Sequence, residues 1–594
     1  MKTLIKSVYN LSFLLKAFWK YGKIYSFVTL FMMAIITPIN ALASVLFTQK
    51  IIDLVAANVS YTEILKTIFR YLSIVFILGM MQYVYDALYK ERAVEKIQSK
   101  IKKEIYDSVL KTDYKYFDDP AFYNNYTWAI NEYVKKTLEA HTLLLTIVRS
   151  LSIVITMFSL IFLLGPWIIV FTVIEMIINV MIQMKQNKIA IDKRDAILPL
   201  NRRLAYVHRI FYQREYSSDI KTTNLRHYLF DIYEQNTEKK LGFIQRFSKK
   251  LLVWTVSQNI VGILYNAIIM AYISYSLIVS KSITGVGKFM SLLTANSQLS
   301  GSLNNVFSLV TNINNLSLYV DKIKMYFDTK SNIENQSDGL AILNAAPFSV
   351  SIRNLNFKYE NSNFELKKIN IEVRAGAKIA IVGANGSGKT TLLKLLLRLY
   401  DVDYGSISYN ELPIQDYNLG DLRNKIGVSF QATNVYAMSM ANNMQLYSRT
   451  TENELNSIVK KIGLVDVLNK SSGSLESELT REFEKDGIVL SAGEQQKIGL
   501  ARVMCQDFNL LLMDEPSSTL DPVAEYDLAK LLFAEANKTT TIIISHRLSM
   551  IRDASCIYVM ENGEIREFGT HEQLMLQKGL YHEMFTKQAD SFVK

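Results

Sequence analysis

The sequence predicts a multidomain protein in which a six-helix α-helical transmembrane domain is followed by an α/β P-loop domain. The charge-free runs long enough to cross a bilayer all lie before about residue 320 of the 594. A glycine-rich stretch, Gly383 to Thr391, follows the apolar run 378–382 and precedes the apolar run 392–396. This order is typical of a phosphate-binding P-loop between a buried strand and a helix. The chain is also too long for one hydrophobic core, so two or more domains are expected.

Residues 1–325 are predicted to form the transmembrane domain. Its six spans are expected at about residues 24–49, 68–90, 138–164, 167–186, 251–280 and 289–320. Gly165-Pro166 interrupts an apolar stretch and predicts a tight hairpin between the third and fourth spans. The long polar connections are basic, which predicts helical extensions in the cytoplasm and both termini on that side. A polar linker at 326–345 is expected to lead into the second domain at 346–590.

The formal net charge is +11, which raises the question of a nucleic-acid partner. Much of the positive charge flanks the apolar stretches, where it is better explained by the positive-inside rule. We therefore predict a lipid bilayer as the partner, and no nucleic acid. The two cysteines, Cys505 and Cys556, both lie in the P-loop half and exclude a disulfide framework there. This composition suits a reducing cytosolic compartment for that half.

Three ionisable residues, His141, Arg149 and Glu175, fall inside predicted spans. Such groups usually face the interior of a helix bundle or a water-filled cavity. A structural ion pair between Arg149 and Glu175, or snorkelling to a membrane face, is an equally open interpretation. The sixth span carries many amides, which predicts either a solvated central pathway or hydrogen bonds between helices. These amides are Asn296, Gln298, Asn304, Asn305, Asn312, Asn314 and Asn315.

The P-loop predicts a polyphosphate site. The glycines allow successive backbone N–H groups to curl round phosphates at a helix N-terminus, where the helix dipole favours anions. Lys389 is expected to reach the β- and γ-phosphates, and the Thr390 hydroxyl to bind Mg²⁺. The loop residues assigned to nucleotide binding are Gly383, Asn385, Gly386, Ser387, Gly388, Lys389, Thr390 and Thr391.

Two further apolar runs end in polar side chains. Residues 509–513 precede Asp514 and Glu515, as expected for a buried parallel strand that delivers carboxylates to the edge of a sheet. Asp514 suits Mg²⁺, usually through its water, and Glu515 suits polarisation of the attacking water. His546 follows the run 541–544 and is predicted to contact the γ-phosphate. Taken alone, a histidine at a strand end is usually structural.

A helix start is predicted at Ser491, because Glu494 three residues later completes a capping box. The same N-terminus is suited to face a phosphate. Further upstream, Tyr359 lies close before the P-loop strand, where an aromatic ring can stack on adenine.

With these residues in order, nearly the whole chain resembles a half-transporter of the ATP-binding cassette (ABC) exporters, of the type I fold. The matching elements are Tyr359 for adenine, Walker A at Gly383 to Thr391, the Q-loop Gln431, the signature motif at Leu490 to Glu494, Walker B at Leu510 to Glu515, the D-loop Ser518 to Asp521 and the switch His546. The resemblance implies ATP and Mg²⁺ as cofactors and ATP hydrolysis as the activity. It also implies that Gln431 binds the metal and assists catalysis alongside Glu515 and His546.

The resemblance further implies a dimer, with a homodimer expected first and a heterodimer left open. Ser491, Gly493 and Glu494 would complete the ATP site of the second copy. Segments 116–120 and 214–221 resemble the short coupling helices of the family. Two residues depart from the usual signature, Ala492 for a glycine and Glu494 for a glutamine, so crowding of the phosphate and an added carboxylate near ATP are expected.

The cargo is predicted from weaker signals. The stretches 117–123 and 521–525 resemble most the bacterial branch that exports modified peptides such as lantibiotics or bacteriocins across the cytoplasmic membrane. A multidrug or lipid exporter shares every ATP-site residue and is the alternative. A nucleotide-gated regulator without productive transport is a third interpretation, against which the intact Glu515 and His546 argue.

Overall fold

The computed structural model describes residues 2–164, 167–278, 285–329, 331–334, 339–342, 346–360, 362–470, 473–517, 525–526, 528–530 and 539–593. The chain divides into two compact units. The helical unit comprises residues up to Ser108 together with Asn124–Asp328. The second unit comprises Val109–Tyr123 and the chain from Thr329 onward. The predicted Gly165-Pro166 hairpin and the predicted D-loop lie outside the described residues.

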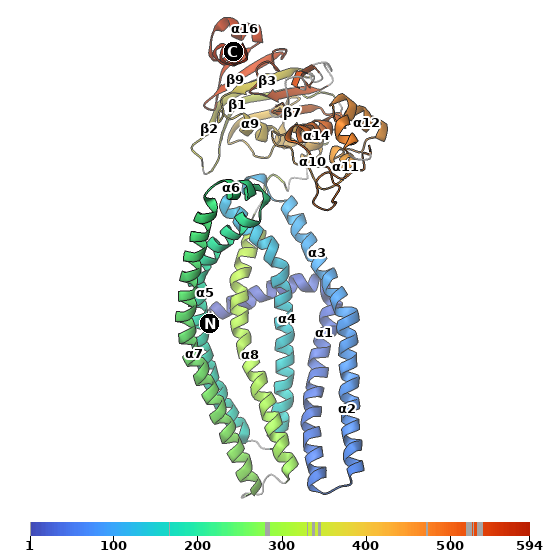
Figure 1. The fold of residues 1–594 in the computed structure, drawn as a ribbon, viewed down its shortest axis with the longest axis vertical. Coiled ribbons are helices and arrows are strands. Elements are labelled where there is room, and N and C mark those ends of the chain that lie inside the picture. The colour runs from blue at the N-terminus through green and yellow to red at the C-terminus, as the bar shows by residue number, and fades with distance from the viewer. Residues whose placement is uncertain are drawn as a thin grey trace. The chain divides into compact units, whose positions relative to one another are not determined.

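The helical unit is built from long helices that extend well beyond the apolar runs (Figure 1). The expected polar connections are helical continuations of the spans, because their residues keep good helix propensity after the apolar stretch ends. The helices are α1 (Lys2–Ala56), α2 (Tyr61–Val84), α3 (Glu91–Leu110), α4 (Pro120–Leu164), α5 (Trp167–Tyr212), α6 (Ser217–Thr222), α7 (Leu225–Ile278) and α8 (Val286–Phe327), with a π-helical turn at Tyr85–Lys90 between α2 and α3.

Helix α1 changes direction at Gly22, where φ is −124° and ψ is 31°. Figure 1 shows the N-terminal part of α1 crossing neighbouring helices before the chain turns to run along them. A β-carbon at Gly22 would lie 2.7 Å from Cδ1 of Ile97, so a larger residue here would displace the Ile97 side chain of α3. The segment before Gly22 is therefore a separate arm of the same helix.

Five helices of the described chain are long and apolar enough to cross a membrane. They include α1, α2, α4, α5 and α7. The sixth predicted span, α8, has 42 residues but is not among these five. Its amides and serines lower its apolar content, so hydropathy alone does not identify it as a span.

The helical unit is held together by two long pairings, α5 with α7 and α1 with α8. An apolar cluster joins α4, α5, α7 and α8, and includes Met157, Ile161, Ile168, Tyr265 and Leu292. Close packing of these side chains provides van der Waals attraction between the helices and holds them side by side.

The second unit contains two sheets. The four-stranded sheet has the order β2–β1–β4–β5, and the six-stranded sheet has the order β10–β9–β3–β8–β7–β6. The strands are β1 (Val350–Lys358), β2 (Glu365–Val373), β3 (Lys378–Gly383), β4 (Tyr404–Tyr409), β5 (Leu412–Pro413), β6 (Ile426–Ser429), β7 (Leu510–Asp514), β8 (Thr540–Ile544), β9 (Cys556–Glu561) and β10 (Glu564–Gly569). The helices are α9 (Lys389–Leu396), α10 (Leu419–Asn424), α11 (Met440–Met444), α12 (Glu452–Lys461), α13 (Val465–Asn469), α14 (Ala492–Met504), α16 (His571–Gln577) and α17 (Leu580–Val593).

The order of the six-stranded sheet positions the site. Strands β6, β7, β8, β3 and β9 are mutually parallel, and each residue of β3 is buried. The register pairs Asp514 of β7 with Ile544 of β8. Because carboxyl ends of parallel strands meet at one edge, the residues that follow β3, β6, β7 and β8 converge there.

The segment 109–123 belongs to the second unit, whereas the sequence analysis assigned it to the transmembrane domain at 1–325. The buried Asp113 carboxylate accepts hydrogen bonds from the backbone N–H groups of Asn332, Ile333 and Glu334, at 2.9 to 3.1 Å. Asp118 accepts hydrogen bonds from the Lys394 ammonium at 3.0 Å and the Tyr400 hydroxyl at 2.5 Å. The second segment that resembles a coupling helix, α6, groups instead with the helical unit.

Candidate active site

The P-loop joins β3 to α9. Gly383 has φ +156° and Gly388 has φ +107°, backbone conformations that L-residues rarely adopt. Gly388 ends this loop as the left-handed residue before the first turn of α9. The loop therefore curls back on itself, and the unpaired N–H groups of the first helical turn face its concave side.

Lys389 and Ser387 fit a polyphosphate bound in this loop. The Lys389 ammonium donates to the carbonyl oxygens of Gly383 and Ala384, both at 2.9 Å. Lys389 is 5% exposed, and burial lowers the pKa of its ammonium. The Ser387 hydroxyl is buried and has no hydrogen-bond partner among the described residues. A bound phosphate would supply both an acceptor for Ser387 and a counter-charge for Lys389.

Glu515 lies between the two other residues predicted to act in catalysis. Gln431, which follows β6, donates from Nε2 to Glu515 Oε2 at 2.7 Å. His546, which follows β8, places Nε2 at 3.0 Å from Glu515 Oε1. Burial and the positive charge of Lys389 lower the pKa of His546, whereas the Glu515 carboxylate raises it. The three side chains thus meet at one edge of the sheet, and their catalytic roles stay predictions.

The backbone of Glu515 is also fixed. Its φ is +50°, a left-handed conformation that is uncommon outside glycine. Its N–H donates to the carbonyl of Ile544 at 2.8 Å, and its carbonyl accepts from Gln496 Nε2 at 2.9 Å. These two bonds hold the strained residue at the end of β7, which turns its carboxylate toward Gln431 and His546.

Asp514 and Thr390 lie where a divalent cation is predicted. Thr390 donates from Oγ1 to Asp514 Oδ2 at 3.1 Å. Burial raises the pKa of Asp514. Hydroxyl and carboxylate oxygens are the donors that Mg²⁺ prefers, so the pair fits the ion that accompanies ATP. Gln431, the third predicted metal residue, contacts Glu515 instead.

Tyr359 lies beside the end of the P-loop. Its hydroxyl is 3.2 Å from Thr391 Oγ1, which it contacts as a donor. Its ring packs edge-on against Phe357 and Tyr400, with centroids 5.0 and 5.3 Å away. The half-buried ring is therefore held in one orientation next to the phosphate loop, which suits its predicted role as an adenine-stacking platform.

The signature motif forms the start of α14. The Ser491 hydroxyl caps the helix, and the Glu494 carboxylate accepts from the Ser491 N–H at 2.7 Å. Glu494 also pairs with the ammonium of Lys470 at 2.5 Å. Burial raises the pKa of Glu494, but the hydrogen bonds from Lys470 and Ser491 outweigh it and hold the pKa below its usual value. The expected added carboxylate is thus a capped and paired group in this chain.

Two residues of this site escaped the sequence reasoning. Gln496 donates a hydrogen bond to the backbone carbonyl of Glu515, and Lys470 forms an ion pair with Glu494. Neither follows from local spacing, because each contact depends on how α14 packs. Among the described residues, Ser491, Gly493 and Glu494 form no hydrogen bond or ion pair with the P-loop of their own chain.

The intramembrane polar residues have different surroundings. Glu175 accepts from Ser300 Oγ at 3.1 and 3.2 Å and from Asn179 Nδ2 at 3.1 Å, and it forms no ion pair with Arg149 in the described chain. His141 is buried and stacks on Phe18, with ring centroids 4.1 Å apart. The amides of α8 serve two purposes. Asn296, Gln298 and Asn304 bond to neighbouring helices, whereas Asn305 lines a cavity.

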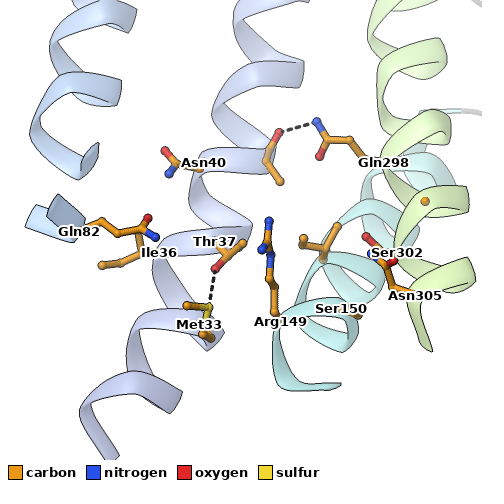
Figure 2. Close-up of a pocket in the computed structure, with 13 residues that line it drawn as sticks. Met33, Ile36, Thr37, Asn40, Gln82, Arg149, Ser150, Gln298, Ser302 and Asn305 are labelled. Carbon is orange, nitrogen blue, oxygen red and sulfur yellow. Dashed lines mark hydrogen bonds between the residues drawn. The ribbon is translucent and has the colours of Figure 1, made fainter. Parts of the chain in front are cut away.

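This cavity has a volume of about 470 Å³ and lies between α1, α2, α4 and α8. Figure 2 shows the Arg149 guanidinium rising from α4 between Thr37 of α1 and Ser302 of α8. Its lining residues are Met33, Ile36, Thr37, Asn40, Ala41, Gln82, Arg149, Ser150, Ile153, Gln298, Gly301, Ser302 and Asn305.

Gly388→Ala should damage the P-loop far more than Gly386→Ala. A β-carbon at Gly388 would lie 2.4 Å from Leu366 Cδ2 and 2.8 Å from Phe364 Cζ, whereas a β-carbon at Gly386 meets nothing within 4 Å. Both glycines have positive φ, so backbone strain is common to the pair. Overpacking of this kind costs about 1–3 kcal/mol. Thermal unfolding of the purified full-length variants should show the difference, and equal losses would contradict the crowded packing at Gly388.

Comparison with known proteins agrees with the two-unit structure. Residues 27–204 match the family model described as the ABC transporter transmembrane region. Residues 366–518 match the model described as ABC transporter. The chain therefore belongs to the ABC transporters, as a member with a transmembrane region and an ATP-binding domain. It is a multi-pass membrane protein and an ATP hydrolase of the exporter type.

Among its relatives is the subtilin transport ATP-binding protein SpaT of Bacillus subtilis, which is 28% identical over 94% of this chain and 91% of SpaT. The ATP-dependent lipid A-core flippase of Salmonella typhimurium is 32% identical, over 43% of this chain and 44% of the flippase. A solved structure of a bacterial Atm1-family ABC exporter with ATP bound shares the fold, with a TM-score of 0.79 and 22% identity over 95% of this chain and 98% of that one.

Proposed function

We propose that this transporter uses ATP to export a modified peptide, such as a lantibiotic or bacteriocin, across the bacterial cytoplasmic membrane. The observation that carries this proposal is the match to SpaT along nearly the full length of both chains, transmembrane helices included. SpaT is a lantibiotic transporter, and its name states that it transports subtilin. The helices of an exporter contact the cargo, so similarity across them bears on substrate class more than similarity of the ATP site does.

Lipid export is the second candidate. The lipid A-core flippases of Salmonella typhimurium and Wigglesworthia glossinidia brevipalpis match this chain over 44% and 60% of their own length, against 91% for SpaT. A multidrug exporter would use the same ATP site. A regulator without turnover is disfavoured by the contacts of Glu515 with Gln431 and His546, since a sensor has no need of a positioned water-polarising acid.

The working unit is proposed to be a dimer, with a homodimer preferred. Among the described residues, the side chains of Ser491 and Glu494 contact each other and Lys470 rather than the P-loop, which leaves them available to complete the ATP site of a second copy. Alternating access then follows from closure and reopening of the two ATP-binding domains. We place both termini in the cytoplasm, which puts the P-loop where ATP is available, and we assign Mg²⁺ to Thr390 and Asp514.

Mass spectrometry of the source organism tests the proposed cargo. The medium and the cell contents of a strain with the wild-type chain are compared with those of a strain carrying Glu515→Gln. We expect at least one peptide to disappear from the medium and accumulate inside the cells. Unchanged secreted peptides together with an altered distribution of lipids, or lost drug tolerance, would favour the second candidate instead.

A further inference from the structure

The cavity around Arg149 has an unbalanced positive charge. Arg149 is the single charged residue among the described residues that line it. Its guanidinium has no hydrogen bond or ion pair within the described part of the chain, and it is exposed to the cavity (Figure 2). An arginine side chain stays protonated in proteins, so this charge persists at every physiological pH.

The acidic residue that lines an adjoining hollow is already paired. Asp86 lines a smaller hollow that adjoins the cavity and shares Met33 and Gln82 with it. The Asp86 carboxylate forms an ion pair with Lys90 at 3.0 Å, one helical turn further along the chain. Glu175, the other acid in this part of the helices, is bound by Ser300 and Asn179. Both acids are therefore engaged with partners other than Arg149.

Several polar side chains that line the cavity also lack hydrogen-bond partners within the described residues. Asn40 Oδ1 is buried without a hydrogen-bond partner. Within the described residues, the side chains of Asn40, Gln82, Ser302 and Asn305 make no hydrogen bond, whereas Gln298 donates to Ser44 Oγ at 2.9 Å. The amide groups of Asn40, Gln82 and Asn305 therefore offer both donors and acceptors to a polar group in the cavity, beside the donors of the guanidinium.

Arg149 lies within a predicted membrane span, away from both ends of α4. From Arg149 to Leu164, the end of α4, the helix rises about 22 Å, which lies inside the about 30 Å thickness of a bilayer's hydrocarbon core. Ionisable groups at this depth face a bundle interior or a water-filled path and mark routes of substrates and ions. Apolar side chains also line the cavity, among them Met33, Ile36 and Ile153.

We infer that the Arg149 cavity binds an anionic oxygen group of the cargo, a carboxylate that lies beside apolar side chains. The planar guanidinium matches the two oxygens of a carboxylate, and the free amides of Asn40, Gln82 and Asn305 supply further donors. The volume of about 470 Å³ is enough for a few side chains, so the cavity would bind one end or one acidic residue of a peptide and not the whole peptide. This inference rests on the proposed peptide export and specifies the chemistry of the cargo.

The test compares five strains of the source organism, which carry the wild-type chain, Glu515→Gln, Arg149→Gln, Arg149→Lys or the control Arg70→Gln. Arg70 is exposed on α2 and does not line the cavity. The compounds that Glu515→Gln retains inside the cells define the cargo by mass spectrometry. We expect this cargo to be a peptide with a free carboxylate, whose export falls about tenfold or more in Arg149→Gln, with a smaller loss in Arg149→Lys and none in Arg70→Gln.

The outcomes separate the two proposals. A cargo without any anionic group, or wild-type export by Arg149→Gln, overturns the anion site and leaves peptide export standing. A retained phospholipid whose export depends on Arg149 overturns peptide export and keeps the anion site, with phosphate as the bound group. No retained compound at all in Glu515→Gln overturns both. Basal ATP hydrolysis by purified Arg149→Gln, expected at the wild-type rate, shows that the variant is folded.

Discussion

Glu515→Gln should abolish ATP turnover by the purified transporter while ATP still binds. The glutamine amide keeps the shape of the side chain, and its carbonyl oxygen can still accept the hydrogen bond from Gln431. It cannot accept a proton from the attacking water, which is the role predicted for the carboxylate. Loss of a general base typically costs about 10²–10⁴-fold in rate. Steady-state release of phosphate measures the loss, and binding of a fluorescent ATP analogue measures retained affinity.

The control for this prediction is Glu572→Gln, the same change at an exposed position in the first turn of α16. It should turn over ATP at the wild-type rate. Turnover by Glu515→Gln within about threefold of the wild type would mean that another group activates the water, because that loss is far below the range for a general base. The assignment of catalysis to the cluster at the end of β7 would then be wrong.

Lys389→Ala should remove most of the affinity for ATP. The ammonium is almost fully buried and is held by the carbonyls of Gly383 and Ala384 at the centre of the P-loop. These carbonyls are weaker partners for a cation than a phosphate, so a bound polyphosphate should draw the ammonium away from them. Hydrogen bonds to charged groups contribute about 1.5–3 kcal/mol each, so loss of two predicts a dissociation constant raised about 100-fold or more.

Equilibrium binding of a fluorescent ATP analogue to the full-length protein measures this effect. Lys460→Ala, at an exposed position in the last turn of α12, removes a lysine without touching the P-loop and should bind as the wild type does. Thermal unfolding without nucleotide distinguishes a damaged loop from a missing phosphate contact. An unchanged dissociation constant in a folded Lys389→Ala variant would contradict the predicted placement of the phosphates.

The convergence of Glu515 and His546 could be expected from the sequence, because each follows an apolar run and parallel strands share one carboxyl edge, whereas Gln431 was expected only from the resemblance to the ABC exporters. The P-loop could be expected for a similar reason, since glycine spacing between a strand and a helix is a local pattern. The pairing of Glu494 with Lys470 and the support of Glu515 by Gln496 could not, because both depend on the packing of α14. The lack of a partner for Arg149 is equally invisible in the sequence.

The membrane helices illustrate the same limit. The apolar runs indicate where five helices lie, but α8 carries so many amides that hydropathy does not identify it. Of the two interpretations that its sequence left open, the hydrogen bonds between helices are present, and a solvated pathway stays a prediction. Asn296 bonds to Tyr265 at 2.5 Å, while Asn305 lines the cavity. Which face of a helix is buried depends on its neighbours, and the neighbours are set by contacts between residues far apart in sequence.

The contacts of Asp113 affect which boundaries a recombinant ATP-binding fragment should have. A fragment that begins near Thr329 looks like a complete soluble domain in the sequence. It would nevertheless lack the segment 109–123, which binds the first residues of the fragment. The N–H groups of Asn332, Ile333 and Glu334 would lose their acceptor, and Lys394 and Tyr400 would lose Asp118. A recombinant ATP-binding fragment should therefore carry residues 109–123 as a fused or added peptide, since this folded unit is discontinuous in the gene.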